Sequence, residues 1–246
     1  AMTAGEPPAD GASVGGDFRI ENEVFVAGDK EPRIRSTTIF QGGVVYDYLE
    51  EPAEVTIFDP QHGRFVLLDS TRRITTELTT QRVLEFTDRL KQWAQGQSDP
   101  FLRFLGDPQF DKESDETSNE LSFNSPRMSY RLTTLDVEKE AVWRQYREFS
   151  DWYCRLNTML NPGARPPFAR LAVNSALEEG QRFPRTVHLT IKPDEGLLKK
   201  RLTVRSEHRL IGQLVESDRK RVAQTDQFLA MYTSVDFREY QRKMAH

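Results

Sequence analysis

The sequence predicts an α+β fold: a large curved antiparallel β-sheet, forming an incomplete barrel, with about four helices packed on one face. Short runs of β-branched and aromatic residues follow one another through the first third of the chain, separated by tight turns. Segments with helical spacing of apolar residues come only at long intervals. Because the turns are too short for crossover connections, neighbouring strands are expected to be antiparallel.

Six strands are predicted in the first third of the chain. They cover residues 17–26, 34–40, 44–49, 55–58, 64–68 and 72–78. The strongest turn signal is Gly42-Gly43, because a primed hairpin turn needs positive φ. Two further hairpins are expected, one from residues 121–123 and 128–135, the other from 186–191 and 202–211 with its turn at 193–196. These segments make about ten strands.

Four main helices are predicted from apolar residues at three- and four-residue steps. They cover residues 80–95, 139–160, the segment from Pro166-Pro167 to Gly180, and residues 217–232. In the first helix, Val83, Phe86, Leu90 and Trp93 are expected to form the buried stripe. Residues 101–105 are expected to add a short helical turn, and residues 237–240 to dock onto the body.

Length and composition describe a globular chain. Its 246 residues include 15 Phe, 7 Tyr and 3 Trp, enough bulky apolar surface for a core. Residues 17–246 are expected to form a single α+β domain. Residues 1–16, rich in Gly, Pro and Ala, are expected to be a flexible leader. No apolar run approaches the roughly 20 residues of a membrane-spanning helix.

A leader of this composition is typical of a mature chain whose signal peptide has been removed. An exported or periplasmic location is therefore expected, with the cytoplasm left open as the alternative. The single cysteine, Cys154, excludes an intrachain disulfide but fits either compartment.

The charge is unevenly distributed along the chain. Residues 1–60 carry 12 acidic and 4 basic side chains, and residues 192–246 carry 8 acidic and 12 basic ones. The favoured interpretation is that the two ends lie side by side and neutralise each other, and the alternative is a surface for a protein partner. The net charge of −4 argues against a nucleic-acid-binding protein.

The sequence contains no P-loop, dinucleotide fingerprint, zinc motif or nucleophile elbow, so no cofactor and no metal are expected.

Asp59 and His62 lie three residues apart in a turn, where they either stabilise the turn or form an acid–base pair. Cys154 is interpreted as a small buried apolar residue, with catalysis as the alternative. Glu207 and His208 point to opposite faces of a strand and so form no site by themselves.

The acidic stretch from 106 to 120 is expected to be an exposed loop, with a calcium loop as the alternative.

The densest aromatic cluster lies on the helix predicted at 139–160. It consists of Trp143, Tyr146, Phe149, Trp152 and Tyr153. Such a cluster either packs against the sheet as core or lines an apolar pocket. These five residues are the candidate ligand-binding residues.

Residues 36–46, followed by 56–60 and 65–69, show a repeated pattern of strand, turn and next strand. Over residues 18–78 this pattern resembles that of the LolA-like group of exported bacterial lipoprotein carriers. The resemblance implies a strongly curved, incomplete barrel closed by helices around an apolar cavity for acyl chains. It carries over no catalytic residue. Thr37, Asp47, Thr56 and Thr75 make the strands more polar than an acyl-binding interior suggests.

The first functional hypothesis is thus a non-enzymatic binding or carrier protein for a lipid or another apolar small molecule. The second is a protein interaction or scaffold module, and the third a hydrolase that uses Asp59 and His62. The first predicts a continuous cavity between helix 139–160 and the inward residues of strands 34–68.

Overall fold

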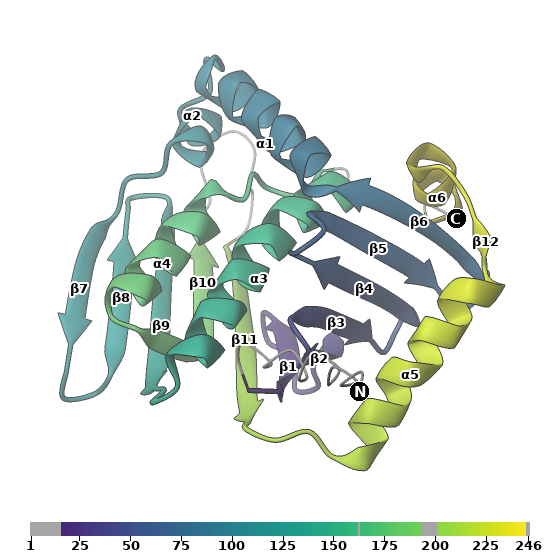
Figure 1. The fold of residues 1–246 in the computed structure, drawn as a ribbon. Helices are drawn as coiled ribbons and strands as arrows, with labels where there is room; N and C mark the ends of the chain where they lie inside the picture. Colours follow the sequence, from purple (N-terminus) through teal and green to yellow (C-terminus); the bar gives the residue numbers. More distant parts are fainter. Residues whose placement is uncertain (1–15, 162, 193–200, 245–246) are drawn as a thin grey trace, which may run out of the picture.

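The computed structural model describes residues 16–161, 163–192 and 201–244, and all its described strands join one 12-stranded sheet. The order is β12-β6-β5-β4-β3-β2-β1-β11-β10-β9-β8-β7. The strands are β1 (Phe18–Val26), β2 (Ile34–Gln41), β3 (Val44–Leu49), β4 (Glu54–Asp59), β5 (Arg64–Asp69), β6 (Ile74–Thr79), β7 (Asp111–Asp115), β8 (Glu120–Asn124), β9 (Met128–Asp136), β10 (Arg182–Ile191), β11 (Leu202–Ile211) and β12 (Thr233–Ser234). The helices are α1 (Thr80–Gln95), α2 (Pro100–Gly106), α3 (Glu140–Leu160), α4 (Phe168–Glu179), α5 (Glu216–Met231) and α6 (Phe237–Met244). Figure 1 shows α3 and α4 crossing the sheet.

The predicted meander from β1 to β6 is confirmed, with each strand antiparallel to the next. At the β2–β3 turn, Gly42 and Gly43 have φ values of 60° and 82°, which an L-residue rarely adopts. The open, mostly antiparallel sheet agrees with the predicted fold class.

The N-terminal and C-terminal parts of the chain meet where β1 pairs with β11. Glu21 on β1 forms an ion pair with Arg209 on β11, and Arg19 bonds Asp218 on α5 at 2.6 Å. The acidic beginning and the basic end of the chain are therefore neighbours, as the favoured interpretation of the charge distribution predicted.

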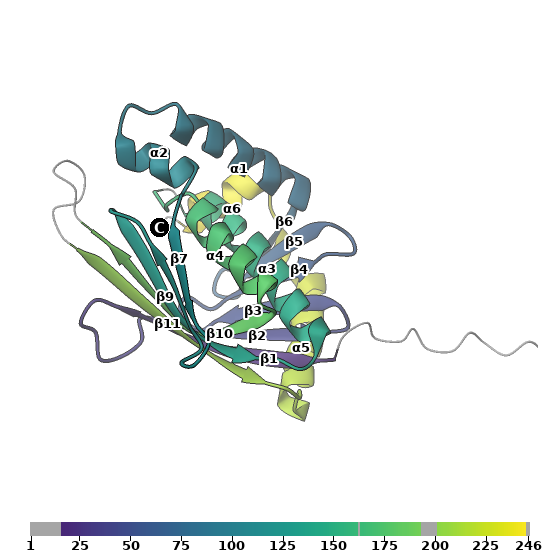
Figure 2. The same ribbon diagram turned by 90° about the vertical axis from the view of Figure 1, so that its left-hand side faces the viewer.

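The concave face of the sheet holds the main core. Its members include Phe18, Phe40, Phe58 and Phe65 from the strands, and Phe149 from α3. The ring centroids of Phe18 and Phe40 are 4.1 Å apart in a stacked arrangement. A second core under α2 and α4 covers the part of the sheet formed by β8–β11. Together α1–α4 and α6 cover this face (Figure 2).

The prediction that the helices gather on one face is wrong for α5, which packs on the opposite face of β2–β5. The cause is visible in the strands, whose outward positions are also apolar. Ile39, Tyr46, Ile57 and Leu68 point outward and are buried against α5 residues such as Val222. Strands covered on both faces carry continuous apolar runs instead of simple alternation.

Six helices replace the predicted four, because the short segments at 101–105 and 237–240 form α2 and α6. The acidic stretch predicted as a loop contains β7, an exposed edge strand paired with β8. The short strand β12 runs parallel to β6, against the expectation of antiparallel neighbours only.

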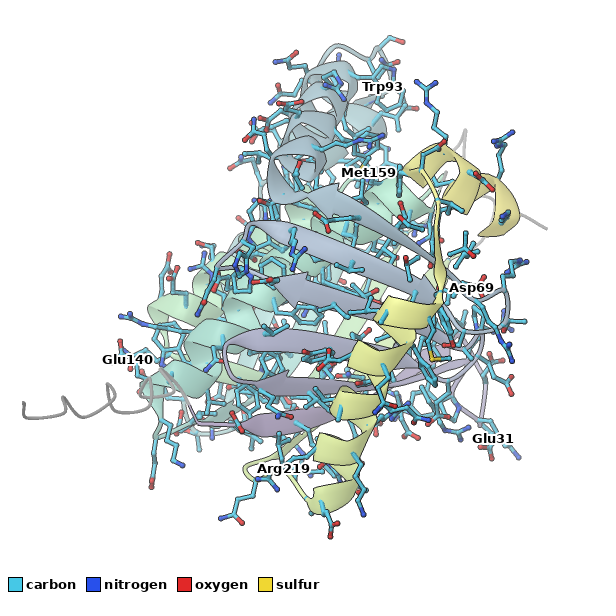
Figure 3. The ribbon with its side chains drawn as sticks, turned by 45° about the vertical axis from the view of Figure 1, so that its right-hand side comes forward. Glu31, Asp69, Trp93, Glu140, Met159 and Arg219 are labelled. Carbon is cyan, nitrogen blue, oxygen red and sulfur yellow. The ribbon has the colours of Figure 1, made fainter. Side chains whose placement is uncertain are left out.

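Trp93 does not belong to the buried stripe predicted for the first helix. It is 51% exposed and lies on α1 far from the sheet (Figure 3). Val83 is buried as predicted, but the other buried residues of the helix are Thr87 and Ala94, so the buried face is rotated from the predicted one. A large apolar side chain at the right spacing is therefore not always part of the packed face.

Two predictions fall wholly or almost wholly outside the described residues: the leader at 1–16, of which only Gly16 is described, and the turn at 193–196. That residues 17–246 form one domain stays a prediction.

Candidate functional site

A cavity of about 1360 Å³ lies between the concave face of the sheet and helices α3, α4 and α6. Its floor is formed by inward residues of β1–β4 and β11, and its roof by one face of α3. The apolar and aromatic lining consists of Ile20, Val24, Ile34, Leu49, Pro52, Tyr146, Phe149, Tyr153 and Leu160. Drug-sized ligands usually occupy pockets of roughly 300–1000 Å³, so this cavity has room for a longer molecule.

The α3 residues that line the cavity run from Tyr146 to Asn161, just past the end of the helix. Between these two lie residues 149, 150, 153, 154, 157 and 160, steps of three and four residues that keep to one helical face. Fifteen residues at 1.5 Å each give the cavity a length of about 22 Å along the helix axis. The shape therefore suits an elongated ligand.

The two ends of the cavity differ. At the end near the C-terminus of α3, the lining residues Asn157, Asn161, Arg238 and Arg242 are exposed to solvent. At the other end, the lining side chains of Tyr146, Arg170 and His208 are buried or half-buried. The cavity is thus open beside α6 and closed beside α4.

A row of hydrogen-bonded polar side chains crosses the floor of the cavity from β3 to β11. The Thr38 hydroxyl donates to Asp47 Oδ1 at 2.7 Å, and Asn22 Nδ2 donates to Thr38 Oγ1 at 2.9 Å and to Ser36 Oγ at 3.1 Å. Asn22 Oδ1 lies 2.8 Å from Nδ1 of His208. We call Asp47, Thr38, Asn22 and His208 the polar row.

Asp47 is the carboxyl end of the polar row. It is 4% exposed, and burial raises the pKa of its carboxyl group, while hydrogen bonds from Thr38 and Tyr153 act against that rise. In turn, the Asp47 charge and burial hold the pKa of Tyr153 well above its usual range, so the phenol stays protonated. Tyr153 on α3 is therefore a hydrogen-bond donor that links the roof to the floor.

His208 is the neutral end of the polar row. Burial, assisted by the charge of Arg170, lowers the pKa of His208 to about 3. Because Asn22 directs its amide nitrogen to Thr38 and Ser36, its oxygen accepts from the Nδ1–H group of His208. A neutral imidazole carries one proton, so Nε2 is left as an acceptor.

Arg170 on α4 is held beside the imidazole by two hydrogen bonds. Its Nε donates to Asn174 Oδ1 at 2.9 Å, and its Nη2 donates to the Tyr146 hydroxyl at 3.3 Å. The rings of Tyr146 and His208 are 6.5 Å apart, centroid to centroid. The closed end of the cavity thus brings together a cation, a phenol and a neutral imidazole.

The five aromatic candidates on α3 divide between two faces of the helix. Tyr146, Phe149 and Tyr153 line the cavity. Trp143 and Trp152 line a separate hollow of about 640 Å³ outside it, among charged side chains of α3 and α4. Trp152 also packs against the core, 6.3 Å from Phe58 between ring centroids. A role for any of the five in ligand binding stays a prediction.

Cys154 lines the cavity, and burial raises the pKa of its thiol to about 12. A protonated thiol is a poor nucleophile, and the Cys154 Sγ–H donates to the backbone oxygen of Asp151 at 3.2 Å. This environment matches the interpretation of Cys154 as a small apolar residue.

Asp59 and His62 do meet, with Oδ2 and Nδ1 2.7 Å apart, but in the β4–β5 turn, away from the cavity lining. Partial burial alone would raise the pKa of Asp59, but the hydrogen bonds from His62 and Arg64 lower it. The His62 side chain is 69% exposed, and Asp59 also accepts from the His62 backbone N–H at 3.2 Å. This is the geometry of a stabilised turn.

Within the described ranges, no three His, Cys, Asp or Glu side chains gather closely enough to hold a metal ion. None of the helices in that same part of the chain combines the length and the hydropathy that a membrane span requires.

The cavity residues that sequence reasoning missed are mainly the polar ones. Asn22, Thr38, His208 and Arg170 belong to no motif, and the sequence neighbour of His208, Glu207, faces the other way. The available signal was the polar side chains at positions where alternation demands apolar ones, as at Asp47. Polar residues on the core side of neighbouring strands can hydrogen-bond with one another, and a set of them therefore indicates a polar site.

No protein-family model matches the sequence, and no curated protein matches it. Among solved structures, the LolA superfamily protein NE2245 from Nitrosomonas europaea aligns with 84% of this chain and 89% of its own, with 8% identical residues and a TM-score of 0.30. This is a weak structural resemblance, and it adds no weight to an assignment of function.

Proposed function

We propose that this protein binds an elongated, mainly apolar small molecule in the cavity between the sheet and α3, as a binding or carrier protein without catalysis. The observation that carries the proposal is the cavity of about 1360 Å³ with aliphatic and aromatic side chains on its floor and roof. Burying the apolar surface of a ligand there contributes roughly 25 cal/mol per Å².

The access route supports the same proposal. The open end is bordered by exposed polar side chains of α3 and α6, including Asn157 and Arg242, and the closed end lies about 22 Å away along α3. A chain-like molecule entering beside α6 can bury most of its length. Export, which the resemblance of residues 18–78 implies, stays a prediction.

The test uses matched substitutions on one strand. Side chains alternate along β11, so Ser206 faces the cavity and Glu207 faces the other way. Ser206→Phe is expected to fill part of the cavity and weaken binding of the fluorescent reporter N-phenyl-1-naphthylamine, whereas Glu207→Phe keeps wild-type affinity. Equal affinity in all three proteins, with circular dichroism showing that each is folded, overturns the proposed site.

A further inference from the structure

The structure also indicates which polar group the ligand carries. This inference rests on the proposed function, because it concerns the chemistry of a molecule bound in the same cavity. It starts from the polar row, in which every side chain except the last has its hydrogen bonds satisfied by a neighbour. Asp47 accepts from Thr38, Thr38 from Asn22, and Asn22 from His208.

The exception is Nε2 of His208. It is buried and has no hydrogen-bond partner among the residues that the structure describes. The direction of the bonds along the row makes it an acceptor, because the one ring proton is on Nδ1 and is donated to Asn22. A buried acceptor without a donor is unfavourable, so a bound state that supplies one is stabilised.

The groups beside Nε2 restrict which functional group of a ligand can bind there. Arg170 lines the same end of the cavity, and its guanidinium offers only donors, so an oxygen that can also accept is favoured there. A hydroxyl donates and accepts with one atom. A carboxylate donates nothing and would face the lone pair of Nε2, and an alkane leaves Nε2 without a donor.

We propose that the ligand carries a hydroxyl group, and that this hydroxyl donates a hydrogen bond to Nε2 of His208 at the closed end of the cavity. Because Nε2 is covered by neighbouring atoms, binding of the hydroxyl requires a side-chain rearrangement at this end of the cavity. The apolar part of the molecule then extends along α3 under Phe149 toward the open end. Long-chain alcohols and other hydroxylated apolar molecules belong to this ligand class.

Displacement of N-phenyl-1-naphthylamine by four probes that share an unbranched twelve-carbon chain tests the proposal. 1-Dodecanol is expected to bind about tenfold more tightly than 1-methoxydodecane, which accepts but cannot donate, and than dodecane. Dodecanoate is expected to bind more weakly than the alcohol. Equal affinities for the alcohol and the ether, or tighter binding of dodecanoate, overturn the inference while leaving the proposed function standing. If no probe and no reporter binds, the proposed function itself fails.

Substitution of His208 tests whether its Nε2 is the hydrogen-bond acceptor for the ligand. In His208→Phe the preference for the alcohol over the ether is expected to fall below about twofold. His188 lies on β10 outside the cavity lining, so His188→Phe is the matched control and keeps the preference. An unchanged preference in His208→Phe contradicts the proposal.

A measurement on the wild-type protein covers the case in which His208→Phe does not fold. In nitrogen-15 NMR spectra of the histidine rings, His208 is expected to be the neutral tautomer protonated at Nδ1. Its Nε2 resonance should shift on addition of 1-dodecanol and not on addition of the ether. A ring protonated at Nε2, or the same shift with both probes, overturns the inference.

Discussion

Thr38 on β2 and Asp47 on β3 occupy directly paired positions and share a hydrogen bond of 2.7 Å in the floor of the cavity. Both side chains are buried, at 3% and 4% exposed. This bond fixes the direction of the donors that follow it, from Asn22 to Thr38 and from His208 to Asn22. The acceptor character of the closed end thus originates at a carboxylate three strands away.

Thr38→Val is expected to lower the free energy of unfolding by about 1–3 kcal/mol, because it removes a donor from a buried carboxylate while keeping the shape of the side chain. Thr37 is its neighbour on the opposite face, so Thr37→Val is the control and should change stability by less than about 0.5 kcal/mol. Urea denaturation at pH 7.5 measures both. Equal effects of the two substitutions would show that the bond to Asp47 does not stabilise the fold.

His208 is expected to make stability fall in mild acid. Its folded pKa of about 3 lies below the unfolded value of 6.5, so the unfolded state binds more protons between these values. Stability is therefore lost as the pH falls from 6.5 toward 3, by roughly 2 kcal/mol between pH 7.5 and pH 5. Urea denaturation of wild type and His208→Gln at both pH values isolates this contribution. A variant that loses as much stability as the wild type contradicts it.

Glu54 is expected to make stability fall as the pH rises, which is the opposite of the His208 effect. Burial, with the nearby Asp69 charge, raises the pKa of Glu54 to about 7, from 4.5 in an unfolded chain. The folded state then binds more protons between these values, and stability falls as the pH rises from 4.5 to 7. Glu54→Gln should therefore be more favourable relative to wild type at pH 8 than at pH 5, as measured by thermal unfolding. The same difference at both pH values would exclude the raised pKa.

Phe149 and Trp143 lie on different faces of α3, and only Phe149 lines the cavity. Phe149→Leu is expected to weaken binding of N-phenyl-1-naphthylamine about two- to tenfold, since it removes an aromatic contact worth about 0.5–1.5 kcal/mol. Trp143→Leu should leave the affinity within about twofold. A larger loss in Trp143→Leu would place the binding site in the outer hollow.

His62→Ala is expected to leave reporter binding unchanged, because His62 is 69% exposed and lies in the β4–β5 turn. The same pair of proteins can be assayed with ester, phosphate and glycoside substrates. Hydrolysis by the wild type that disappears in His62→Ala would support the hydrolase hypothesis and contradict a purely binding role.

The meander was predictable from the sequence because the residues that specify each turn and strand are close together in the chain. Two glycines with positive φ specify the β2–β3 turn, and the strands on either side are β-branched or aromatic. The helix at 140–160 was equally predictable from its apolar spacing. The position of α5 was not, because outward residues such as Tyr46 and Ile57 differ little from inward ones in hydrophobicity.

The cavity was predictable only in part, between α3 and the early strands. Its polar row joins residues as far apart as Asn22 and His208, and the pairing of β1 with β11 that brings them together has no local signal. Arg170 reaches the site from α4, whose orientation depends on packing against α3. Long-range strand pairing and helix packing are tertiary properties, so a single sequence does not display them.

A protein that holds an apolar small molecule in this cavity should retain it during gentle purification. The most direct test is native mass spectrometry of the protein purified gently from its expression host, followed by organic extraction of the same sample. We expect a mass above that of the chain, an extractable apolar compound, and a reduced occupancy in Ser206→Phe but not in Glu207→Phe. A wild-type protein of bare chain mass that also fails to take up N-phenyl-1-naphthylamine would contradict it.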